Sequence, residues 1–334
     1  MTKAANRTLL KVGQYVLVVL LIFVFNFTLP RLMPGDPTDF VTGTDVDAPY
    51  VLDEETRQRL LAYHGLDKPV AAQFARYVAN VACGDLGYAI YYKCPVSGLV
   101  GSRLPWTLLL AGTAFVLSTV AGVFLGAAAA FRAGSRLDRT LTGVLLGIRA
   151  MPAYLLGMLA IIVFSVGLGL FPLGGATSAF ARYSSPFGAA ADIVWHMMLP
   201  LAVLTIAQIA GVYLTMRNAM VAVLGETYML MAEAKGLPPR RRAYSYGMRN
   251  AILPLYSRVG VRLGMLVTGT IFIESVFNYP GMGRLAYEAT MVHDYPVLQG
   301  IFLVTALAIV GANILVDATY WLVDPRVRQA GGEA

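Results

Sequence analysis

"LPWTLLLAGTAFVLSTVAGVFLGAAAAF", residues 104–131, runs for 28 positions without a charged side chain. A helix needs about 20 predominantly apolar residues to cross the hydrocarbon core of a bilayer, so this run is long enough. Of the 334 residues, 57% are hydrophobic and only 13% are charged. A soluble domain carries roughly a quarter charged residues. The composition therefore predicts an all-α, polytopic membrane protein.

Six apolar stretches are candidates for transmembrane helices. They are residues 12–30, 104–131, about 140–167, 193–216, about 263–278 and 295–316. The fifth stretch is the shortest and contains Glu274, so it is the least regular of the six. The sequence predicts six transmembrane helices, with a cap segment outside the membrane after the first helix and a long loop between the fourth and the fifth.

The predicted orientation follows from where lysine and arginine fall between these stretches. With the N-terminus inside the cell, the inner segments carry 16 basic residues and the outer segments carry nine. Acidic residues have the opposite distribution: nine lie within residues 36–85, and the inner loops before the fifth stretch contain only Asp138, Glu226 and Glu233. Because short basic loops stay on the cytoplasmic side of a membrane, we expect both termini to be cytoplasmic.

These features divide the chain into four parts. Residues 1–30 are the N-terminal tail and the first helix, 31–103 the extracytoplasmic segment, 104–323 the core with the other five helices, and 324–334 the C-terminal tail. Within the extracytoplasmic segment, the leucine pattern of residues 51–69 predicts a helix. Both cysteines, Cys83 and Cys94, fall in this segment, on the predicted oxidising side. A disulfide between them and a pair of free thiols are equally open.

The loop between the fourth and fifth stretches contains a basic segment, residues 225–254, whose sequence predicts two short helices. Its first part, "GETYMLMAEAK", is rich in helix formers, and Gly236 follows where a glycine caps a helix end. Pro238 and Pro239 suit the first turn of a second helix, which must stop before Pro254. An ordinary loop facing anionic lipid would explain the charge. It does not explain a helix–turn–helix in a long loop, since connections between bundled helices are usually short.

The basic segment resembles the cytoplasmic coupling loop of binding-protein-dependent ABC importer permeases, in the branch for dipeptides, oligopeptides and nickel. That branch has an A-x-A-K-G-L stretch followed by an R-N-A-x-x-P stretch. The matching residues are Ala232, Ala234, Lys235, Gly236, Leu237, Arg249, Asn250, Ala251 and Pro254. The resemblance extends along nearly the whole chain through "LPRLMPGDP", "GDLGYAIYYKCPV", "ESVFNYPGMGRL" and "DPRVR", which match in kind and order.

The basic segment departs from the general permease pattern at two places. That pattern opens with Glu-Ala-Ala six residues before the glycine, where this chain has Leu230, Met231 and Ala232. Tyr246 stands near the position at which many relatives have histidine. These departures bear on individual contacts of the loop and not on the resemblance as a whole.

The resemblance implies the transmembrane permease subunit of an ATP-driven importer in the plasma membrane of a bacterium or archaeon. It implies as partners a second homologous permease subunit, two ABC ATPase subunits, an extracytoplasmic substrate-binding protein and the lipid bilayer. No cofactor is expected in this chain, since ATP and Mg would be bound by the ATPase subunits. A dipeptide or oligopeptide is the expected substrate, and nickel or a nickel complex is the alternative.

Motifs of other function classes are missing from the sequence. The chain has no G-x-x-x-x-G-K-[ST], so it lacks the phosphate-binding loop of an ATPase. It has neither H-E-x-x-H nor G-x-S-x-G, which argues against a membrane enzyme. The net charge of +7 follows membrane sidedness, so it does not indicate nucleic-acid binding. A passive channel, the remaining alternative, would not need a helix–turn–helix for docking a motor.

Charged residues inside the predicted spans are candidates for the translocation pathway, because a charge is costly in hydrocarbon. Arg149 either meets a carboxylate, of the substrate or of Glu274, or extends its side chain toward the inner interface. Pro152, just after Arg149, is expected to kink the helix that contains Arg149. The pathway candidates are Arg149, Pro152, Glu274, Phe277, Pro280 and Gly281.

An imidazole side chain stands directly before two thioether side chains at His196, Met197 and Met198. A nickel site could use these ligand types. One histidine beside two methionines on an apolar helix is more often part of the packing. We therefore expect no metal site in this chain.

Overall fold

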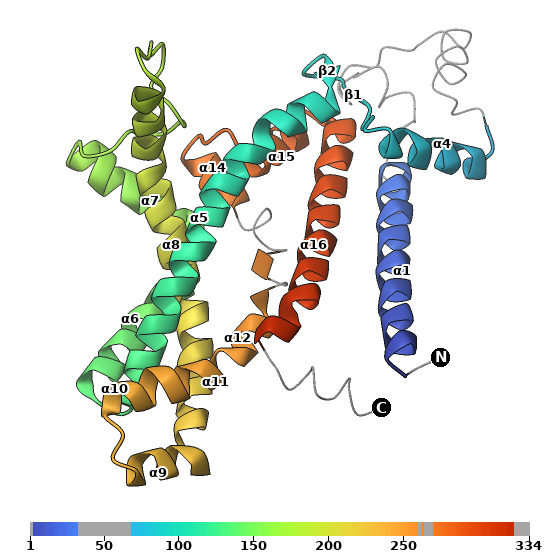
Figure 1. The fold of residues 1–334 in the computed structure, drawn as a ribbon. Helices are drawn as coiled ribbons and strands as arrows, with labels where there is room; N and C mark the ends of the chain where they lie inside the picture. Colours follow the sequence, from blue (N-terminus) through green and yellow to red (C-terminus); the bar gives the residue numbers. More distant parts are fainter. Residues whose placement is uncertain (1–2, 33–67, 260–261, 264–269, 324–334) are drawn as a thin grey trace. The chain divides into compact units, whose positions relative to one another are not determined.

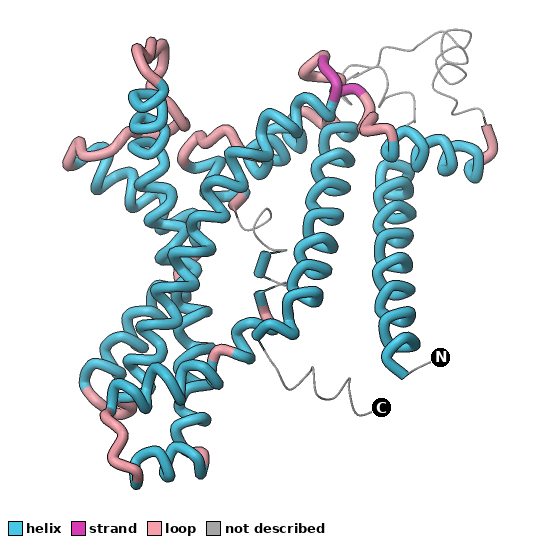
Figure 2. The backbone as a smooth tube through the Cα atoms, in the orientation of Figure 1, coloured by secondary structure: helices cyan, strands magenta, loops and turns pink. Residues whose placement is uncertain are grey.

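The computed structural model describes residues 3–32, 68–259, 262–263 and 270–323, and helices make up most of these ranges (Figure 1; Figure 2). The chain divides into two compact units. The first contains the residues up to Pro105 together with Leu285–Gly311, and the second contains Trp106–Arg284 and Ala312–Glu333.

The first unit combines the N-terminal helix with the segment that follows it. Its elements are α1 (Lys3–Leu32), α4 (Val70–Ala82), β1 (Tyr88–Ala89), β2 (Cys94–Pro95), the start of α5 (Val96–Phe131), most of α15 (Met282–Met291) and the start of α16 (Tyr295–Val323). The rings of Phe27 and Phe74 lie 5.2 Å apart and pack α4 against α1. Asn26 Nδ2 donates to the Tyr77 hydroxyl at 2.8 Å and to the Gln299 carbonyl at 3.1 Å. One buried amide thus joins α1, α4 and α16.

The second unit consists of long helices and a run of short ones. Its elements are α5 from Trp106 onward, α6 (Arg136–Ala150), α7 (Ala153–Ala160), η1 (Ile161–Gly167), α8 (Pro186–Leu224), α9 (Thr227–Ala234), α10 (Pro239–Arg241), η2 (Arg242–Met248), α11 (Arg249–Ala251), α12 (Leu253–Ser257), α14 (Ile271–Val276) and the end of α16. The Ser185 hydroxyl accepts a hydrogen bond from Gly188 N, so α8 begins with a side-chain cap, and Pro186 occupies its first turn.

Helices α5 and α8 pack against each other through glycine. A methyl group at Gly122 would lie 2.6 Å from Val212 Cβ, and one at Gly126 would lie 2.7 Å from the Tyr213 carbonyl oxygen. Residues four apart share one face of a helix. Small residues at such a face let two membrane helices approach closely. Any larger side chain at these positions would therefore push α5 away from α8.

Two apolar clusters fill the second unit. One surrounds Phe277 and Tyr279 and is built mainly from α7, α8 and the chain after α14; its buried members are Leu110, Ala114, Ala160, Ala176, Met197, Leu199, Val203, Leu204, Ile273, Phe277 and Tyr279. The other joins α5 and the last turns of α8 to the short helices of the basic segment; its buried members are Val123, Ala127, Ala130, Val212, Met216, Met220, Ala243, Ala251 and Leu255.

The predicted transmembrane helices are confirmed in part. Within the described ranges, four helices are long and apolar enough to cross a membrane: Leu9–Leu29, Val96–Phe131, Pro186–Leu224 and Tyr295–Thr319. The number is five if α6 and the helix after it count as one bent span. The fifth predicted stretch falls mostly outside the described residues, which include only α14 and its neighbours there. A multi-pass helical membrane protein is thus confirmed, and the number six stays a prediction.

The third predicted stretch is sharply bent. Arg136–Ala150 and Ala153–Gly167 meet at an angle of 97°. Met151 has an extended backbone, and Pro152, which precedes α7, has no N–H to continue the α6 ladder. The kink expected at Pro152 is confirmed, and it is a break between two helices where the sequence predicted one kinked helix.

The structure describes the outer segment, residues 31–103, mainly from residue 68 onward. The helix expected within residues 51–69 lies, except for its last two residues, outside the described residues. The helix that the structure describes there is α4, at Val70–Ala82, which the sequence pattern did not single out. Cys83 and Cys94 are free thiols, so the disulfide that the sequence left open is not formed in this structure.

Candidate functional site

The first half of the basic segment, residues 225–254, is a short helix closed by a glycine turn. The chain leaves α9 through Gly236, whose φ is +69°. Gly236 N donates to the Glu233 carbonyl at 2.8 Å, and Leu237 N donates to the Ala232 carbonyl at 3.2 Å. These two bonds satisfy carbonyls that the helix end would leave unpaired, as in a Schellman cap. The predicted glycine cap is confirmed, because glycine adopts this φ without the strain that a Cβ causes.

The second half of the basic segment is helical from Pro239 to Ala251, through α10, η2 and α11. Ile252 interrupts the helix, and α12 begins at once with Pro254 in its first turn. The expected stop near Leu253 is seen only as the end of α11 at Ala251. Ile252 keeps a right-handed helical backbone and Leu253 already belongs to α12, so Pro254 does not exclude helix at the residue before it. Pro254 instead suits the start of α12, because it has no N–H to leave unpaired there.

Both halves of the basic segment are held by buried side chains. Met229 and Ala232 are the buried residues of α9. In the second half, a methyl group at Gly247 would lie only 2.5 Å from Met220 Cε, so η2 packs tightly on the end of α8. An ion pair of 2.5 Å between Glu233 and Arg242 Nη1 joins the two halves. The segment is therefore a folded part of the second unit.

The opposite face of α9 is apolar and exposed. Leu230 is 62% exposed and Met231 57% exposed, at two of the positions where the chain departs from the general permease pattern. Among the predicted coupling residues, Ala232 and Ala251 are buried, Leu237 and Asn250 are half-buried, and Ala234, Lys235, Gly236, Arg249 and Pro254 are exposed. The exposed residues of this set are the ones that a partner could contact.

Glu274, a predicted pathway residue, is completely buried. Its Oε1 accepts a hydrogen bond from the Thr107 hydroxyl at 2.8 Å. Its Oε2 accepts bonds from Gly283 N at 2.7 Å and from Arg284 N at 3.1 Å. These two amides belong to the first turn of α15, where a carboxylate is favoured by the free N–H groups. The carboxylate therefore anchors the start of a helix.

The turn between α14 and α15 folds around this carboxylate. Asn278 has a φ of +51°, and Tyr279 N donates to the Glu274 carbonyl at 2.8 Å. A methyl group at Gly281 would overlap the Glu274 carboxyl group, so the turn passes directly over it. Phe277 is buried and packs against Gly157 of α7, while Pro280 is half-buried. Glu274, Phe277 and Gly281 thus form one packed turn.

Arg149 and Pro152 lie at a different place, the break between α6 and α7. Arg149 is exposed in the last turn of α6, whereas Glu274 is bound by the side chains of Thr107 and Thr270 and by the backbone of Gly283 and Arg284. The structure therefore does not bring Arg149 to Glu274. The expectation that Arg149 and Glu274 line a translocation pathway stays a prediction.

A hollow of about 440 Å³ lies between α7, η1 and α8. Its walls are apolar and come from Leu156, Leu159, Ala160, Val163, Phe164, Phe171, Met198, Leu199, Ala202, Val203 and Ile206. The lining includes none of the predicted pathway residues. Met198 faces this hollow, while the His196 Nδ1 lies 2.9 Å from the Asp192 carbonyl of its own helix. Among the described residues, no group of three or more histidine, cysteine or acidic side chains is placed to hold a metal.

The hairpin formed by β1 and β2 is hydrogen-bonded to residues around the start of α16. Tyr91 N donates to Asp294 Oδ2 at 2.8 Å, and the Tyr92 hydroxyl donates to Glu288 Oε2 at 3.1 Å. Burial, reinforced by the Glu288 carboxylate, raises the pKa of the Tyr92 phenol to about 12, so it remains a hydrogen-bond donor at neutral pH. The hairpin carries the exposed rings of Tyr88 and Tyr91.

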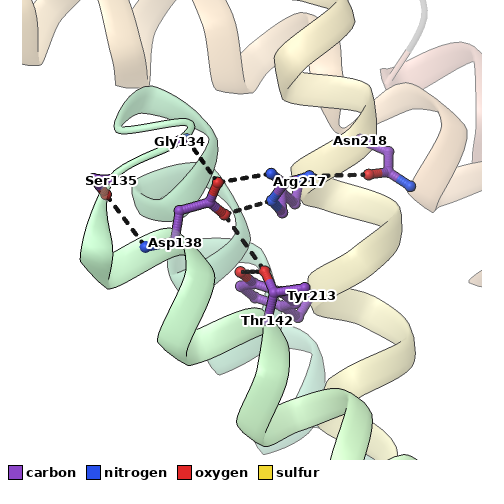
Figure 3. A network of polar contacts seen from close by, with 7 residues as sticks. All are labelled: Gly134, Ser135, Asp138, Thr142, Tyr213, Arg217 and Asn218. Carbon is purple, nitrogen blue, oxygen red and sulfur yellow. Dashed lines mark hydrogen bonds and ion pairs between the residues drawn. The ribbon is translucent and has the colours of Figure 1, made fainter.

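One polar pair between helices was not predicted from the sequence (Figure 3). Arg217 Nε donates to Asp138 Oδ1 at 2.6 Å, and Arg217 Nη2 donates to Asp138 Oδ2 at 2.7 Å. Asp138 is only 2% exposed. The sequence offered one signal, since Asp138 is one of three acids in otherwise basic inner loops. It did not indicate the partner, which lies 79 positions away.

The fold and its sites define a multi-pass helical membrane protein with a folded basic segment directly after the long apolar helix α8. Residues 122–329 match the model of the family "Binding-protein-dependent transport system inner membrane component". The chain belongs to this family, whose matched region contains α6, α8 and the whole basic segment.

Similarity to curated relatives extends over nearly the full length. A Brucella suis protein that carries the name "peptide permease protein" is 36% identical over 97% of this chain and 98% of its own. The dipeptide transport system permease protein DppB of Escherichia coli K12 is 35% identical over 92% of this chain and 94% of its own. The oligopeptide transport system permease protein AppB of Bacillus subtilis is 30% identical over 96% of this chain and 98% of its own.

Proposed function

We propose that this chain forms half of the translocation pathway of an ATP-driven importer of dipeptides or oligopeptides. The observation that carries the proposal is similarity, over more than nine-tenths of the chain, to permeases named for dipeptide and oligopeptide transport. The fold is consistent with this role, because the polytopic helical core would provide the pathway and the basic segment a contact for a motor.

In this proposal the basic segment couples the chain to an ATPase. A short rigid helix with exposed apolar residues can lie in a groove of a partner, and α9 has this form. Leu230 and Met231 would supply the apolar contact, and Lys235 with Arg249 would surround it with positive charge. The Schellman turn at Gly236 keeps α9 at a fixed angle to the second half, so a push on α9 is passed on to α8.

The proposal includes the partners that the family description implies. A second homologous permease would complete the pathway, two ATPase subunits would bind ATP and Mg, and an extracytoplasmic protein would deliver the substrate to the outer segment. The complex would lie in the plasma membrane of a bacterium or archaeon, with both termini of this chain in the cytoplasm. The names of the similar permeases favour peptides over the nickel alternative.

The test is co-purification from native membranes in mild detergent, with Gly236→Asp as the variant. An aspartate at φ +69° strains the turn and tilts α9, so we expect the wild type to bring two ATPase subunits and a second permease, and the variant to lose the ATPases. Gly84→Asp is the matched control. Gly84 closes α4 with the same pair of bonds, at φ +81° and likewise with open space around it, and it lies outside the basic segment.

Transport is then measured with the purified complex in vesicles. ATP-dependent uptake of a labelled dipeptide in the presence of the co-purified binding protein would support the importer. Uptake without ATP would favour a channel, and uptake of labelled Ni²⁺ without that of peptides would favour the alternative substrate. A wild-type chain that brings no ATPase would contradict the role given to the basic segment.

A further inference from the structure

A compact polar network joins the start of α6 to α8 (Figure 3). Besides its two bonds from Arg217, the Asp138 carboxylate accepts a hydrogen bond from Gly134 N at 3.0 Å. One turn further along α6, the Thr142 hydroxyl lies 2.8 Å from the Tyr213 hydroxyl. Tyr213 is completely buried. The network therefore binds two successive turns of α6 to two successive turns of α8.

The same stretch of α8 holds the basic segment on a neighbouring face. Met216 and Met220 belong to the apolar cluster that contains Ala243, Ala251 and Leu255 of the short helices. Tyr213 and Arg217 follow the same four-residue spacing and face α6. Because residues four apart lie on one face of a helix, residues 212–220 of α8 have one face on the basic segment and another on α6.

The link leads from α8 to the break in the third span. α6 begins at the network, with the Ser135 hydroxyl accepting from Asp138 N at 3.2 Å, and runs unbroken to Ala150. The 97° bend follows immediately. A helix fixed at one end to α8 carries any movement of α8 to its other end, where the chain is free of the helical ladder and can bend.

We propose that the Asp138–Arg217 pair makes α6 and α8 move as one body, so that displacement of the basic segment is taken up at the Met151–Pro152 break. This inference rests on the coupling role proposed for the basic segment. Asp138 and Arg217 are positioning residues in it. The two-pronged geometry fits this purpose, because a guanidinium held by both carboxylate oxygens fixes orientation as well as distance.

The experiment measures distances between spin labels in the assembled complex in nanodiscs. Cys83→Ser and Cys94→Ser remove both native thiols. Label pair one joins Val144 of α6, 55% exposed, to Val221 of α8, 41% exposed. Label pair two joins Val144 to Leu159 of α7, 49% exposed, across the break. Each pair is measured without nucleotide and with a non-hydrolysable ATP analogue and Mg²⁺.

We expect pair one to keep its distance in both states and pair two to change by at least about 3 Å, more than the 1–2 Å helix shifts that packed interfaces absorb. These distances are measured in a chain with the native Asp138 and Arg217. If the distance of pair one changes between the two states, or the distance of pair two stays constant, the proposal is overturned. The test therefore does not depend on whether a network variant folds.

Asp138→Asn then tests the ion pair itself. We expect pair one to become state-dependent and pair two to become constant, and peptide uptake per ATP hydrolysed to fall at least tenfold while the ATPases remain bound. Asp192→Asn is the matched control, since it removes a carboxylate of α8 that binds Ser178 and Tyr183 at the other end of the helix. An Asp138→Asn complex with wild-type distances and coupling, or a control that behaves like Asp138→Asn, overturns the proposal.

Failure of the proposed function gives a different result. If no ATPase co-purifies with the wild-type chain, the ATP analogue has no subunit to bind. The coupling role proposed for the basic segment is then contradicted. Pair one still tests the link in the chain alone, because Asp138→Asn must then lengthen or broaden its distance distribution relative to the wild type.

Discussion

Two carboxylates of the second unit, Asp138 and Glu274, are buried away from water, and different partners stabilise each of them. Each is at most 2% exposed, and each accepts backbone N–H bonds close to the start of a helix. Asp138 is also held by the Arg217 guanidinium, from a helix far along the chain. The donors described for Glu274 are neutral: the Thr107 hydroxyl of α5 and the backbone amides of Gly283 and Arg284 in α15 are among them.

This difference predicts which substitutions around each carboxylate lower the stability of the protein. A buried charge with a cationic partner depends on that partner, and removing either one leaves the other uncompensated. A carboxylate surrounded by neutral donors depends on the shape of the turn around it, because each donor must be brought to it by the backbone. We therefore expect Asp138 to be sensitive to charge and Glu274 to be sensitive to the volume of its neighbours.

The largest effect is expected for Asp138→Ala. It leaves the Arg217 guanidinium facing the helix interface without its carboxylate, and breaking a buried pair in this way costs about 3–5 kcal/mol in the free energy of unfolding. The measurement is denaturant unfolding of the purified chain in detergent micelles. The double variant Asp138→Ala with Arg217→Met removes both charges, so it must be more stable than the single variant. If the double variant is the less stable one, the charge argument fails.

The next effect is expected at Gly281. A methyl group there overlaps the Glu274 carboxyl group, so Gly281→Ala must shift the turn, and overpacking of this kind costs about 1–3 kcal/mol. Gly143→Ala is the control in the middle of α6, where open space surrounds the new methyl group and alanine is the better helix former. Melting temperatures of the two variants in the same detergent should move in opposite directions. Equal shifts would show that volume at Gly281 is unimportant.

An effect of similar size is expected for Thr107→Val, which keeps the shape of the side chain and removes its hydroxyl. The hydroxyl donates to Glu274 and accepts from Met282 N at 2.7 Å, so valine leaves buried polar groups without this partner. The expected cost is about 1–3 kcal/mol. Thr113→Val is the control, because its exposed hydroxyl donates only within α5, to the Leu109 carbonyl. Chemical denaturation of both variants decides whether the Thr107 hydroxyl matters to the site.

The smallest effect is expected for Tyr213→Phe. It removes the hydrogen bond to Thr142 and the contact of the hydroxyl with the Arg217 guanidinium, and it leaves the two bonds between Asp138 and Arg217 in place. Hydrogen bonds between membrane helices contribute about 0.6 kcal/mol on average. A loss as large as that of Asp138→Ala would mean that the whole network, and not the ion pair, holds α6 to α8.

Local signals in the sequence predicted local structure well. Pro152 indicated the bend and Gly236 indicated the helix end, because a missing N–H and a missing Cβ act on the backbone at the residue itself. Uncharged runs predicted the long helices for a similar reason, since the bilayer requires about 20 apolar residues in succession.

Contacts between distant residues could not be predicted. Glu274 was singled out as a charge in an apolar stretch, yet its role depends on Thr107, which lies 167 positions earlier. The Asp138–Arg217 pair depends in the same way on how α6 packs on α8. Neither spacing nor composition encodes these distances, because the packing of the helices decides them. A contact between Arg149 and Glu274, one of the alternatives that the sequence left open, is absent from the structure for this reason.

The bend between α6 and α7 also restricts where lipid can lie. At Met151 and Pro152 the backbone leaves the helical ladder, and both residues are exposed on the surface of this chain. Hydrocarbon offers no hydrogen bonds, so irregular backbone at membrane depth is tolerated only against protein or water. Where α6 and the helix after it cross the membrane as one bent span, this face must therefore be covered by another subunit or open to an aqueous space.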